Sequence, residues 1–472
     1  FYHKLTWAVI YFFRYIMAPK INLLTEKIYP SLLRFVTPLL LMWLQTSVFG
    51  MIDLLIISNF TDTSAIDAVA GGISVMNVIT YTIAALTTGG GILIGQYLGA
   101  KRYEDVKKLI GNMFILFGVI RFVIAIVMAS LSSSIATWLN LDGLAKSDGF
   151  NYLLITAAGI PFIMGFNIIA SQLRAFGNSR SPFLFLLLAA SVNILLDLLF
   201  VALLDMRAAG AALASVISQI SSFTAAILYL KAKNFPVRLT KKNIRFDGHF
   251  SKLTLRTGLP LALQDGIVLL SFTVILALIN LYGAESGSGF GISEKITFFC
   301  FVPLNAFSAA LTATTAQNLG AKQLKRAKQY ARAGLLMQGL MVTIIVIICE
   351  IFAPQLVSLF TSDANIIFYA SSFIRIIALD ALICIFIYVL NALFMGSGHT
   401  TFSMMQNVLS TLLIRLPLAF IFVFVLRTQV TVVAFAYPLA SVFSLIACLI
   451  YYKLGRWKKI KESKPAALKR SS

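Results

Sequence analysis

Long uninterrupted apolar segments, separated by short polar ones, dominate the pattern along the chain. Most have about 20 residues or more, the length that an α-helix needs to cross the hydrocarbon core of a bilayer. The segments are continuous and do not alternate with period two, so the pattern excludes an outer-membrane β-barrel. The sequence therefore predicts an all-α polytopic membrane protein with twelve transmembrane helices, at about residues 33–58, 66–97, 109–131, 150–173, 182–204, 207–230, 254–282, 286–318, 333–353, 366–395, 401–426 and 430–452.

The sequence also contains an internal repeat. QYLGAK at 96–101 recurs as QNLGAK at 317–322, and RAFGNS at 174–179 aligns with FMGSGHT at 394–400. The first pair is 221 positions apart, the second aligns Gly177 with Gly398 at the same offset of 221, and Pro38 and Pro260 are 222 apart. Each half then holds six spans, so both halves have the same orientation and form two pseudo-symmetric six-helix bundles. A cavity between such bundles, open alternately to either side of the membrane, is the usual transporter design.

The spans and the repeat together predict the domain organisation. An N-terminal cytoplasmic or interfacial segment covers 1–32, the first six-helix bundle 33–230, and a cytoplasmic linker 231–253. The second bundle covers 254–452, and a basic cytoplasmic tail covers 453–472. We expect a monomer.

Composition narrows the class of protein. Of 472 residues, 59% are hydrophobic and 12% are charged, whereas soluble domains carry about 25% charged residues. This excludes a soluble globular fold, and the apolar content excludes disorder. The net charge of +21 comes from Lys and Arg in the N-terminus, the even-to-odd loops and the C-terminal tail. That side is predicted to be cytoplasmic, with both termini inside a multi-pass protein of the cell inner (plasma) membrane.

Neither an enzyme nor a nucleic-acid-binding protein is predicted. The basic residues lie in short loops between spans, and the basic tail suits anionic lipid headgroups, so membrane lipids and not nucleic acid are the expected partners. The three His residues form no HExxH motif, no cysteine belongs to a CxxC pair, and no GxxxxGK[ST] is present. We therefore expect no cofactor. A membrane-embedded transferase is the alternative from a different class; it would need a clustered acid, His or metal motif at a membrane face, and none stands out in the sequence.

Ionisable residues inside predicted spans are the candidate functional residues, because a charge in hydrocarbon is costly. Asp53 in span 1 and Asp197 in span 5 each lie about seven residues before the outer end of their span. Asn193 precedes Asp197 by four residues and shares its helix face, and Ser215 in span 6 reaches a similar depth. These four oxygen-bearing side chains are predicted to form one coupling site that holds a proton or, at Asp53, Asn193 and Asp197, a Na⁺ ion.

The repeat sharpens this hypothesis. Asp53 corresponds to Ile275 and Asp197 to Leu418, so the second half lacks the acidic pair. Polar groups that only hold helices together would be expected in both halves, whereas ion coupling needs only one.

Other polar residues are candidates for a substrate cavity. Gln45 and Phe49 form a stripe with Asp53 at i, i+4 and i+8 of span 1. Asp265 and Asp380 lie within spans of the second half, and the cations inside spans are Arg121, Lys295, Arg375 and Arg415.

The chain resembles the multidrug and toxic compound extrusion (MATE) family over about residues 30–452. The resemblance rests on the two parallel six-span halves, the LGAK stretches, RAFGNS, and SVNILLDLLF followed by GAALASVIS. Asp53, Asn193 and Asp197 match the branch typified by DNA-damage-inducible protein F, which implies a first-half cation or proton site; Ser215 falls where that branch often has a hydroxyl. Span 7 lacks the glutamate of the other branches.

The resemblance implies a function and its runner-up. The chain is expected to be a secondary active multidrug efflux transporter that exchanges amphipathic, mainly cationic compounds for inward H⁺ or Na⁺ by alternating access. The alternative within the same superfamily is a lipid-linked oligosaccharide flippase.

Overall fold

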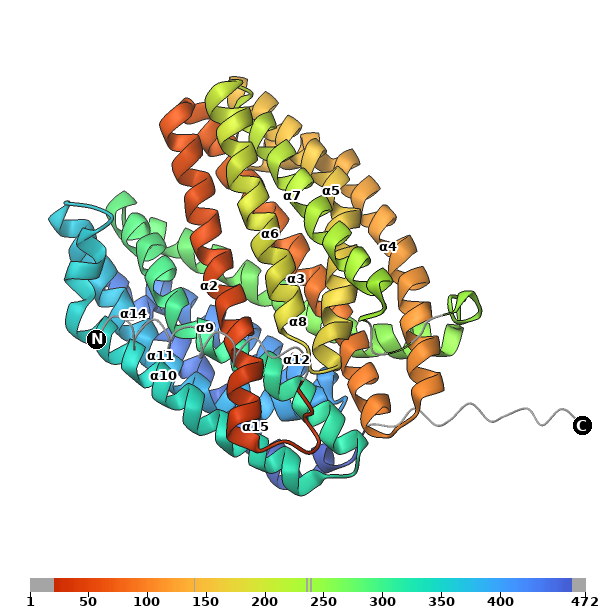
Figure 1. Cartoon of the computed structure of the whole chain (residues 1–472). Coiled ribbons are helices and arrows are strands. Elements are labelled where there is room, and N and C mark those ends of the chain that lie inside the picture. The colour runs from red at the N-terminus through yellow and green to blue at the C-terminus, as the bar shows by residue number, and fades with distance from the viewer. Residues whose placement is uncertain (1–20, 140, 235–236, 238–239, 461–472) are drawn as a thin grey trace, which may run out of the picture. The chain divides into compact units, whose positions relative to one another are not determined.

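The computed structural model describes residues 21–139, 141–234, 237 and 240–460. Every regular element in these ranges is a helix, as Figure 1 shows. Predictions for residues 1–20 and 461–472, including most of the N-terminal segment and half of the basic tail, lie outside the described residues.

The first half of the chain consists of long helices joined by short turns. Figure 1 shows α5 beside α4 and α7, coloured from orange to yellow-green. Their bounds are α2 (Ile28–Phe60), α3 (Thr63–Gly99), α4 (Tyr103–Trp138), α5 (Gly143–Ala175), α6 (Arg180–Asp197) with its π-helical continuation η1 (Leu198–Leu203), and α7 (Arg207–Tyr229) with η2 (Leu230–Asn234).

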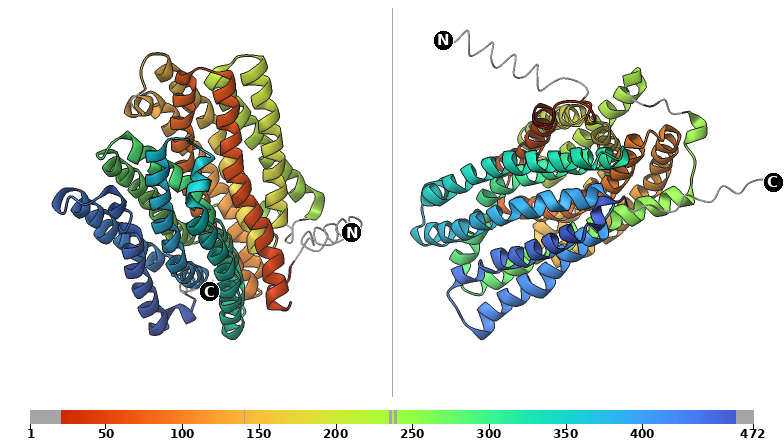
Figure 2. Two further views of the ribbon diagram at one scale, coloured as in Figure 1. Left: turned by 90° about the vertical axis from the view of Figure 1, so that its left-hand side faces the viewer. Right: turned by 90° about the horizontal axis from the view of Figure 1, so that it is seen from below.

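The second half repeats this order. Figure 2 shows its green to blue helices running alongside one another. After the short η3 (Lys241–Asn243) come α8 (Gly248–Asn280), α9 (Ala284–Gly320), α10 (Leu324–Ser358), α11 (Ala364–Gly396), α12 (Thr400–Leu409), η4 (Ser410–Arg415), α13 (Leu416–Phe420), η5 (Ile421–Val425), α14 (Val430–Val433), α15 (Ala436–Leu454) and η6 (Arg456–Lys458).

The fold class predicted from the sequence is confirmed. In the described part of the chain, eleven helical runs are long and apolar enough to cross a membrane. The helix α2, with 33 residues, lies at the predicted first span and brings the number of long helical runs to twelve. Most of the helices extend several residues past the predicted spans, because their ends carry polar residues that a hydropathy pattern does not count.

The chain divides into two compact units, and two helices take part in both. Unit 1 contains Leu41–Ala262, and unit 2 contains Asn22–Leu40 and the described residues from Leu263 onward. The change of unit falls just after Pro38 in α2 and just after Pro260 in α8. The start of each half's first span therefore packs with the other half's helices.

Polar contacts hold the start of the first span in unit 2. Arg326 Nε and Asn318 Nδ2 each donate to the carbonyl oxygen of Leu23 over 3.2 Å. The hydroxyls of Ser31 and Tyr330 lie 2.8 Å apart and share a hydrogen bond. These contacts join the segment before Pro38 to α9 and α10.

The start of α8 is held in unit 1 by a close backbone contact. A Cβ atom added to Gly258 would lie 2.4 Å from the carbonyl oxygen of Leu86 in α3, so only glycine fits there. Small residues allow such close helix crossings in membrane proteins. In addition, Oδ1 of Asn112 accepts from the backbone N–H of Asp247 over 2.8 Å.

The predicted repeat is visible in the helix ends. Lys101 follows α3 with φ 58°, and Lys322 follows α9 with φ 59°. Gly177 and Gly398 follow α5 and α11 with φ 80° and 85°. In all four turns the next N–H donates to a carbonyl five residues earlier, which is the Schellman arrangement that satisfies the last carbonyls of a helix. Corresponding helices therefore end in the same geometry.

The repeat changes its offset by one residue near the end of the chain. Gly177 and Gly398 are 221 positions apart, whereas Asp205 and Arg427, which also share a positive φ (50° and 48°), are 222 apart. The π-helix η1 matches η5, but η4 has no counterpart in the first half. A π-helical turn accommodates one extra residue in a helix, so η4 accounts for the change.

This offset corrects one expectation. From Arg415, the last residue of η4, onward the offset is 222, so the counterpart of Asp197 is Ala419, and the prediction of Leu418 was wrong by one position. The same offset pairs Asn193 with Arg415 and Ser215 with Tyr437.

Candidate functional site

The acidic residues of the first half meet around one asparagine, and all of them belong to unit 1. With its amide oriented so that the nitrogen faces the two carboxylates, which the surrounding groups require, Asn193 on α6 donates to Oδ1 of Asp53 on α2 over 2.9 Å and to Oδ2 of Asp197 over 3.2 Å. Its amide oxygen accepts from the backbone N–H of Ser215 on α7 over 3.2 Å. Asn193 and Asp197 are buried and Asp53 is half-buried. The structure thus brings the four predicted residues together.

The two carboxyl groups of this cluster also lie close to each other. Asp53 and Asp197 are within side-chain hydrogen-bonding reach, and Oδ1 of Asp197 is buried without a hydrogen-bond donor. Two negative charges this close repel strongly where the dielectric constant is low. The arrangement is therefore suited to hold a proton or a cation between the two groups.

Tyr152 on α5 is a member of this site that sequence reasoning missed. Its side chain is 4% exposed and lies within hydrogen-bonding reach of Ser215. Gly72 on α3 makes room for the ring, since a Cβ there would lie 2.2 Å from Cδ1 of Tyr152. The available signal in the sequence was the pair Gly71–Gly72, but two adjacent glycines do not indicate which ring fills the space.

The predicted cavity residues of span 1 have different surroundings. Gln45 donates from Nε2 to the carbonyl oxygen of Leu186 on α6 over 2.8 Å, and its Oε1 is buried without a partner. Gln45 therefore links α2 to α6. Phe49 lies in α2, and its side chain is outside the described residues.

Asp265 and Asp380 lie in unit 2, on α8 and α11. Asp265 accepts a long hydrogen bond of 3.4 Å from Nε2 of its neighbour Gln264. Asp380 is 2% exposed; its Oδ2 lies 3.9 Å from Sγ of Cys384, and its Oδ1 has no partner. No hydrogen bond among the described residues joins the two, so their place in one cavity stays a prediction.

The positions in the second half that correspond to the acidic pair are apolar. Ile275 and Ala419 are fully buried in one hydrophobic cluster with Phe290, Phe373 and Tyr437. The second half therefore has a packed apolar core at the place where the first half has carboxylates.

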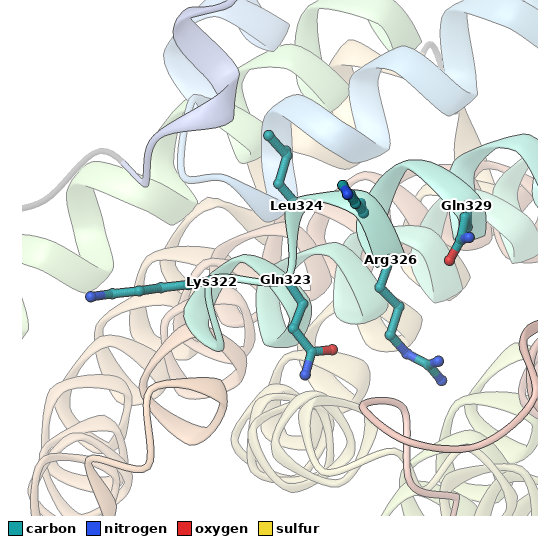
Figure 3. A pocket seen from close by; sticks show the side chains of 6 residues that line it. Lys322, Gln323, Leu324, Arg326 and Gln329 are labelled. Atoms are coloured by element: carbon teal, nitrogen blue, oxygen red, sulfur yellow. The ribbon is translucent and has the colours of Figure 1, made fainter.

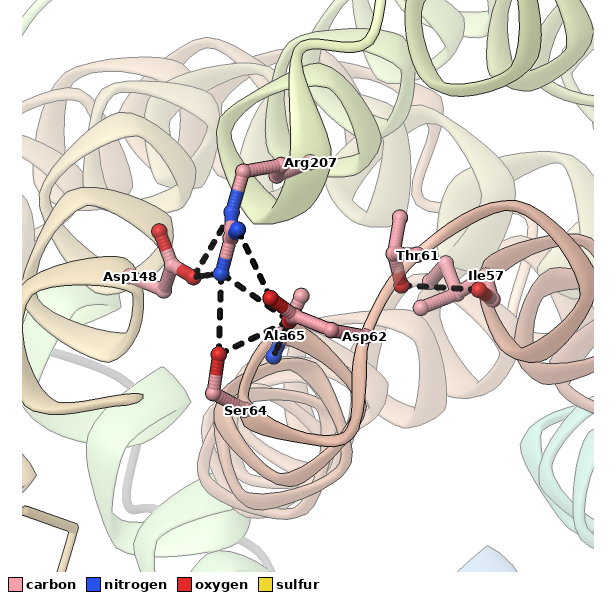
Figure 4. Close-up of polar contacts among 7 residues, drawn as sticks. All are labelled: Ile57, Thr61, Asp62, Ser64, Ala65, Asp148 and Arg207. Carbon is pink, nitrogen blue, oxygen red and sulfur yellow. Dashed lines mark hydrogen bonds and ion pairs between the residues drawn. The ribbon is translucent and has the colours of Figure 1, made fainter. Parts of the chain in front are cut away.

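An ion-pair network closes the end of unit 1 where α7 begins (Figure 4). Arg207 pairs with Asp62 over 2.8 Å and with Asp148 over 2.7 Å. Hydrogen bonds from Ser64 and from the backbone N–H of Ala65, together with Arg207, lower the pKa of the Asp62 carboxyl. The network ties the loop before α3 to α5 and α7.

A hollow of about 690 Å³ lies at the start of α10 (Figure 3). It contains none of the predicted site residues, and its Arg326 is already engaged with the carbonyl of Leu23. The residues that line it are mostly basic or amide-bearing: Lys322, Gln323, Leu324, Lys325, Arg326 and Gln329.

Two copies of one helical unit in a polytopic membrane chain are an arrangement that many transporter folds share. The comparison with known proteins agrees. The MatE family model matches residues 38–199 and again residues 260–421, and the chain belongs to this family. The two matches are 222 positions apart and coincide with the repeat.

Curated relatives cover nearly the whole chain. The probable multidrug resistance protein YoeA of Bacillus subtilis is 24% identical over 92% of this chain and 95% of its own length. The multidrug export protein MepA of Staphylococcus aureus is 24% identical over 81% of this chain and 85% of its own length. These relatives are named as a multidrug resistance protein and a multidrug export protein.

Solved structures share the fold. An outward-facing multidrug resistance MATE family transporter of the MOP superfamily has a TM-score of 0.86 at 22% identity, over 93% of this chain and 98% of that one. A MOP superfamily transporter from Pyrococcus furiosus, for which reverse polarity of the binding pocket suggests a different function, also has a TM-score of 0.86, at 21% identity over 94% and 100% of the two chains.

Proposed function

We propose that this chain is a secondary active multidrug exporter that exchanges amphipathic, mainly cationic compounds for inward H⁺ or Na⁺ by alternating access. The coupling site is the cluster of Asp53, Asn193 and Asp197, with Ser215 beside it. The single observation that carries the proposal is the carboxylate pair bridged by Asn193 inside the membrane-spanning part of unit 1.

The chemistry of the cluster suits a coupling ion. Without an added proton or cation, two carboxylates share one amide donor, which leaves their repulsion incompletely balanced. A proton on one carboxyl would remove a charge and donate a hydrogen bond to the other. Na⁺ would be held by the same oxygens, and a half-turn of the Asn193 amide would add a third oxygen ligand.

Binding of the ion would change how α2, α6 and α7 pack, because each supplies one part of the cluster. A ligand shifts a conformational equilibrium only through its differential affinity for the two states. Export is coupled if the drug prefers the state in which the cluster holds no ion. Each exchange then returns one ion inward for the drug released outward.

The experiment is counter-transport in proteoliposomes with a fluorescent lipophilic cation and separately imposed Na⁺ and H⁺ gradients. Asp53→Asn and Asp197→Asn are each expected to lower gradient-driven efflux by about 100-fold, since the charge that takes up the ion is lost. Asn193→Ala is expected to be milder, because it removes a neutral group. Asp380→Asn should be milder still if the first half carries the coupling alone.

Asp67→Asn is the matched control. Asp67 is an exposed aspartate on α3, so its substitution removes the same charge away from the cluster and should leave efflux within about two-fold. Near-normal gradient-driven efflux in both cluster variants, at equal membrane abundance, would refute the first-half site and direct attention to Asp265 and Asp380.

The proposal also includes the orientation of the chain in the membrane, its oligomeric state and its branch of the family. Both termini are placed on the cytoplasmic side of the inner membrane by the distribution of Lys and Arg, and the protein acts as a monomer in contact with membrane lipids. Membership in the branch of DNA-damage-inducible protein F rests on Asp53, Asn193 and Asp197. The flippase alternative receives no support from relatives that are named as multidrug transporters.

A further inference from the structure

The second half carries an arginine inside a membrane-spanning run. Arg415 is the last residue of η4, within the run Thr400–Val425. None of the ion pairs formed among the described residues includes it. A charged group at such a place is costly and requires a partner. π-Helical turns such as η4 also occur frequently at functional sites.

The unsatisfied part of Arg415 is one defined edge of its guanidinium group. Nη1 lies 3.4 Å from Oγ of Ser271 on α8, whereas Nε is buried without a hydrogen-bond partner. Nε and Nη2 form the side edge of the planar group. A carboxylate binds this edge with two parallel hydrogen bonds.

Aromatic rings position the guanidinium group, and one of them adds a free hydroxyl. The Arg415 Cζ atom lies 4.9 Å from the ring centre of Tyr437 and 5.7 Å from that of Phe272. Tyr437 is 2% exposed, and its hydroxyl is buried without a partner. A buried hydroxyl without a partner is unfavourable, and here two neighbouring donors lack the acceptor that would satisfy them.

Asp380 is the internal candidate for that acceptor. It attracts Arg415 electrostatically, but the two form no ion pair within the described residues. The side-chain donors within reach of Asp380 are the hydroxyl of Ser441 and Sγ of Cys384, the latter at 3.9 Å. The free edge of Arg415 is therefore left to a group that the described chain does not supply.

The internal repeat pairs Arg415 and Tyr437 with residues of the coupling site in the first half. Arg415 occupies the place of Asn193, and Tyr437 the place of Ser215, while the acidic pair is replaced by buried Ile275 and Ala419. The place that holds carboxylates in the first half holds donors in an apolar core in the second. The binding chemistry of the two halves is thus of opposite sign.

We infer that Arg415 and Tyr437 form a carboxylate-binding subsite in the second half, which takes the acidic group of zwitterionic amphipathic substrates. The inference rests on the proposed export function and extends it to a second class of substrate. Compounds that carry both a cationic and a carboxylate group bind here through the carboxylate.

The test uses two dyes with one ring system: a rhodamine with a free benzoate, which is a zwitterion, and its methyl ester, which is a monocation. Efflux of each is measured in proteoliposomes of wild type, Arg415→Gln, Arg415→Lys and Tyr437→Phe. Arg415→Gln is expected to raise KM for the zwitterion by about 10-fold or more and to leave the ester within about two-fold. Arg415→Lys should restore part of the loss, and Tyr437→Phe should raise KM for the zwitterion a few-fold.

Arg427→Gln is the matched control, since Arg427 is an exposed arginine in the loop that follows η5. Equal losses for both dyes in Arg415→Gln, or no loss for either, would overturn the subsite. Repetition in vesicles with and without anionic lipid separates the sources of the acid: an effect on both dyes that appears only with anionic lipid assigns Arg415 to a headgroup and also overturns it. Failure of the ester to move with any gradient would instead refute the proposed function.

Discussion

Lys101 and Lys322 have nearly the same φ at the ends of α3 and α9. Asp53 and Ile275, which also occupy equivalent positions in the two halves, have polar and apolar surroundings respectively. Asp53 hydrogen-bonds to a buried amide, and Ile275 packs in a hydrophobic cluster. Helix ends are governed by backbone hydrogen bonds that any side chain allows, so duplication preserved their geometry. Core positions depend on side-chain chemistry, and there the halves have diverged.

The starts of α2 and α8 show the same contrast. Arg326 and Asn318 hold the start of the first span through hydrogen bonds to Leu23. Gly258 holds the start of α8 through backbone contact with Leu86. In both halves the start of the first helix belongs to the other unit. The start of α2 is held by polar side chains, whereas the start of α8 is held by a close backbone contact that a glycine allows.

The largest effect is expected from an acid placed in the wrong half. Ile275→Asp would bury a carboxylate where the described neighbours are apolar, whereas Asp53 has Asn193 as a donor. We expect a loss of about 3–5 kcal/mol in stability, as for other uncompensated buried charges, measured by thermal unfolding of the purified protein in detergent. Ile275→Val is the control, with a loss of about 0.5–1.5 kcal/mol. Equal melting temperatures of Ile275→Asp and the control would show that the two cores are not chemically distinct.

The glycine contact of α8 gives the next largest effect. In Gly258→Ala the new Cβ would lie 2.4 Å from the carbonyl oxygen of Leu86, so α3 and α8 must move apart. Overpacking of this kind costs about 1–3 kcal/mol, and unfolding in detergent would measure it. Gly291→Ala on α9, where no atom lies within 4 Å of the added Cβ, should stabilise by about 0.5–1 kcal/mol. If both variants shift the melting temperature in the same direction, the close crossing does not hold α8.

The parts of this molecule that sequence predicted are those that follow from periodicity and solvation. Twelve apolar segments of bilayer length predict twelve spans, because hydrocarbon admits no unpaired backbone. The meeting of Asp53 with Asn193 and Asp197 was predictable as well, since the i, i+4 spacing on α6 gives one face and the distances to the span ends give one depth.

The parts that sequence missed depend on packing between distant segments. Tyr152 belongs to the site because Gly72 on another helix leaves room for its ring, and no local pattern pairs these two positions. The one-residue error at Ala419 arose because a π-helical turn such as η4 leaves no mark on hydropathy. The exchange of helix starts likewise depends on contacts across nearly 300 positions, such as that of Ser31 with Tyr330.

The smallest effect concerns the feature that the two halves share. Lys101 and Lys322 adopt a positive φ, which costs a residue with a side chain about 1–2 kcal/mol and glycine little. Lys101→Gly and Lys322→Gly are therefore each expected to stabilise by about 0.5–1 kcal/mol, after the greater flexibility of the unfolded glycine is subtracted. Because the two turns lie in separate units, their effects on the free energy of unfolding should be equal and additive. Lys325→Gly, inside the first turn of α10, should destabilise by about 0.5–1 kcal/mol. If only one of the two substitutions raised the free energy of unfolding, the two turns would share a backbone conformation but not the energetic cost of the positive φ.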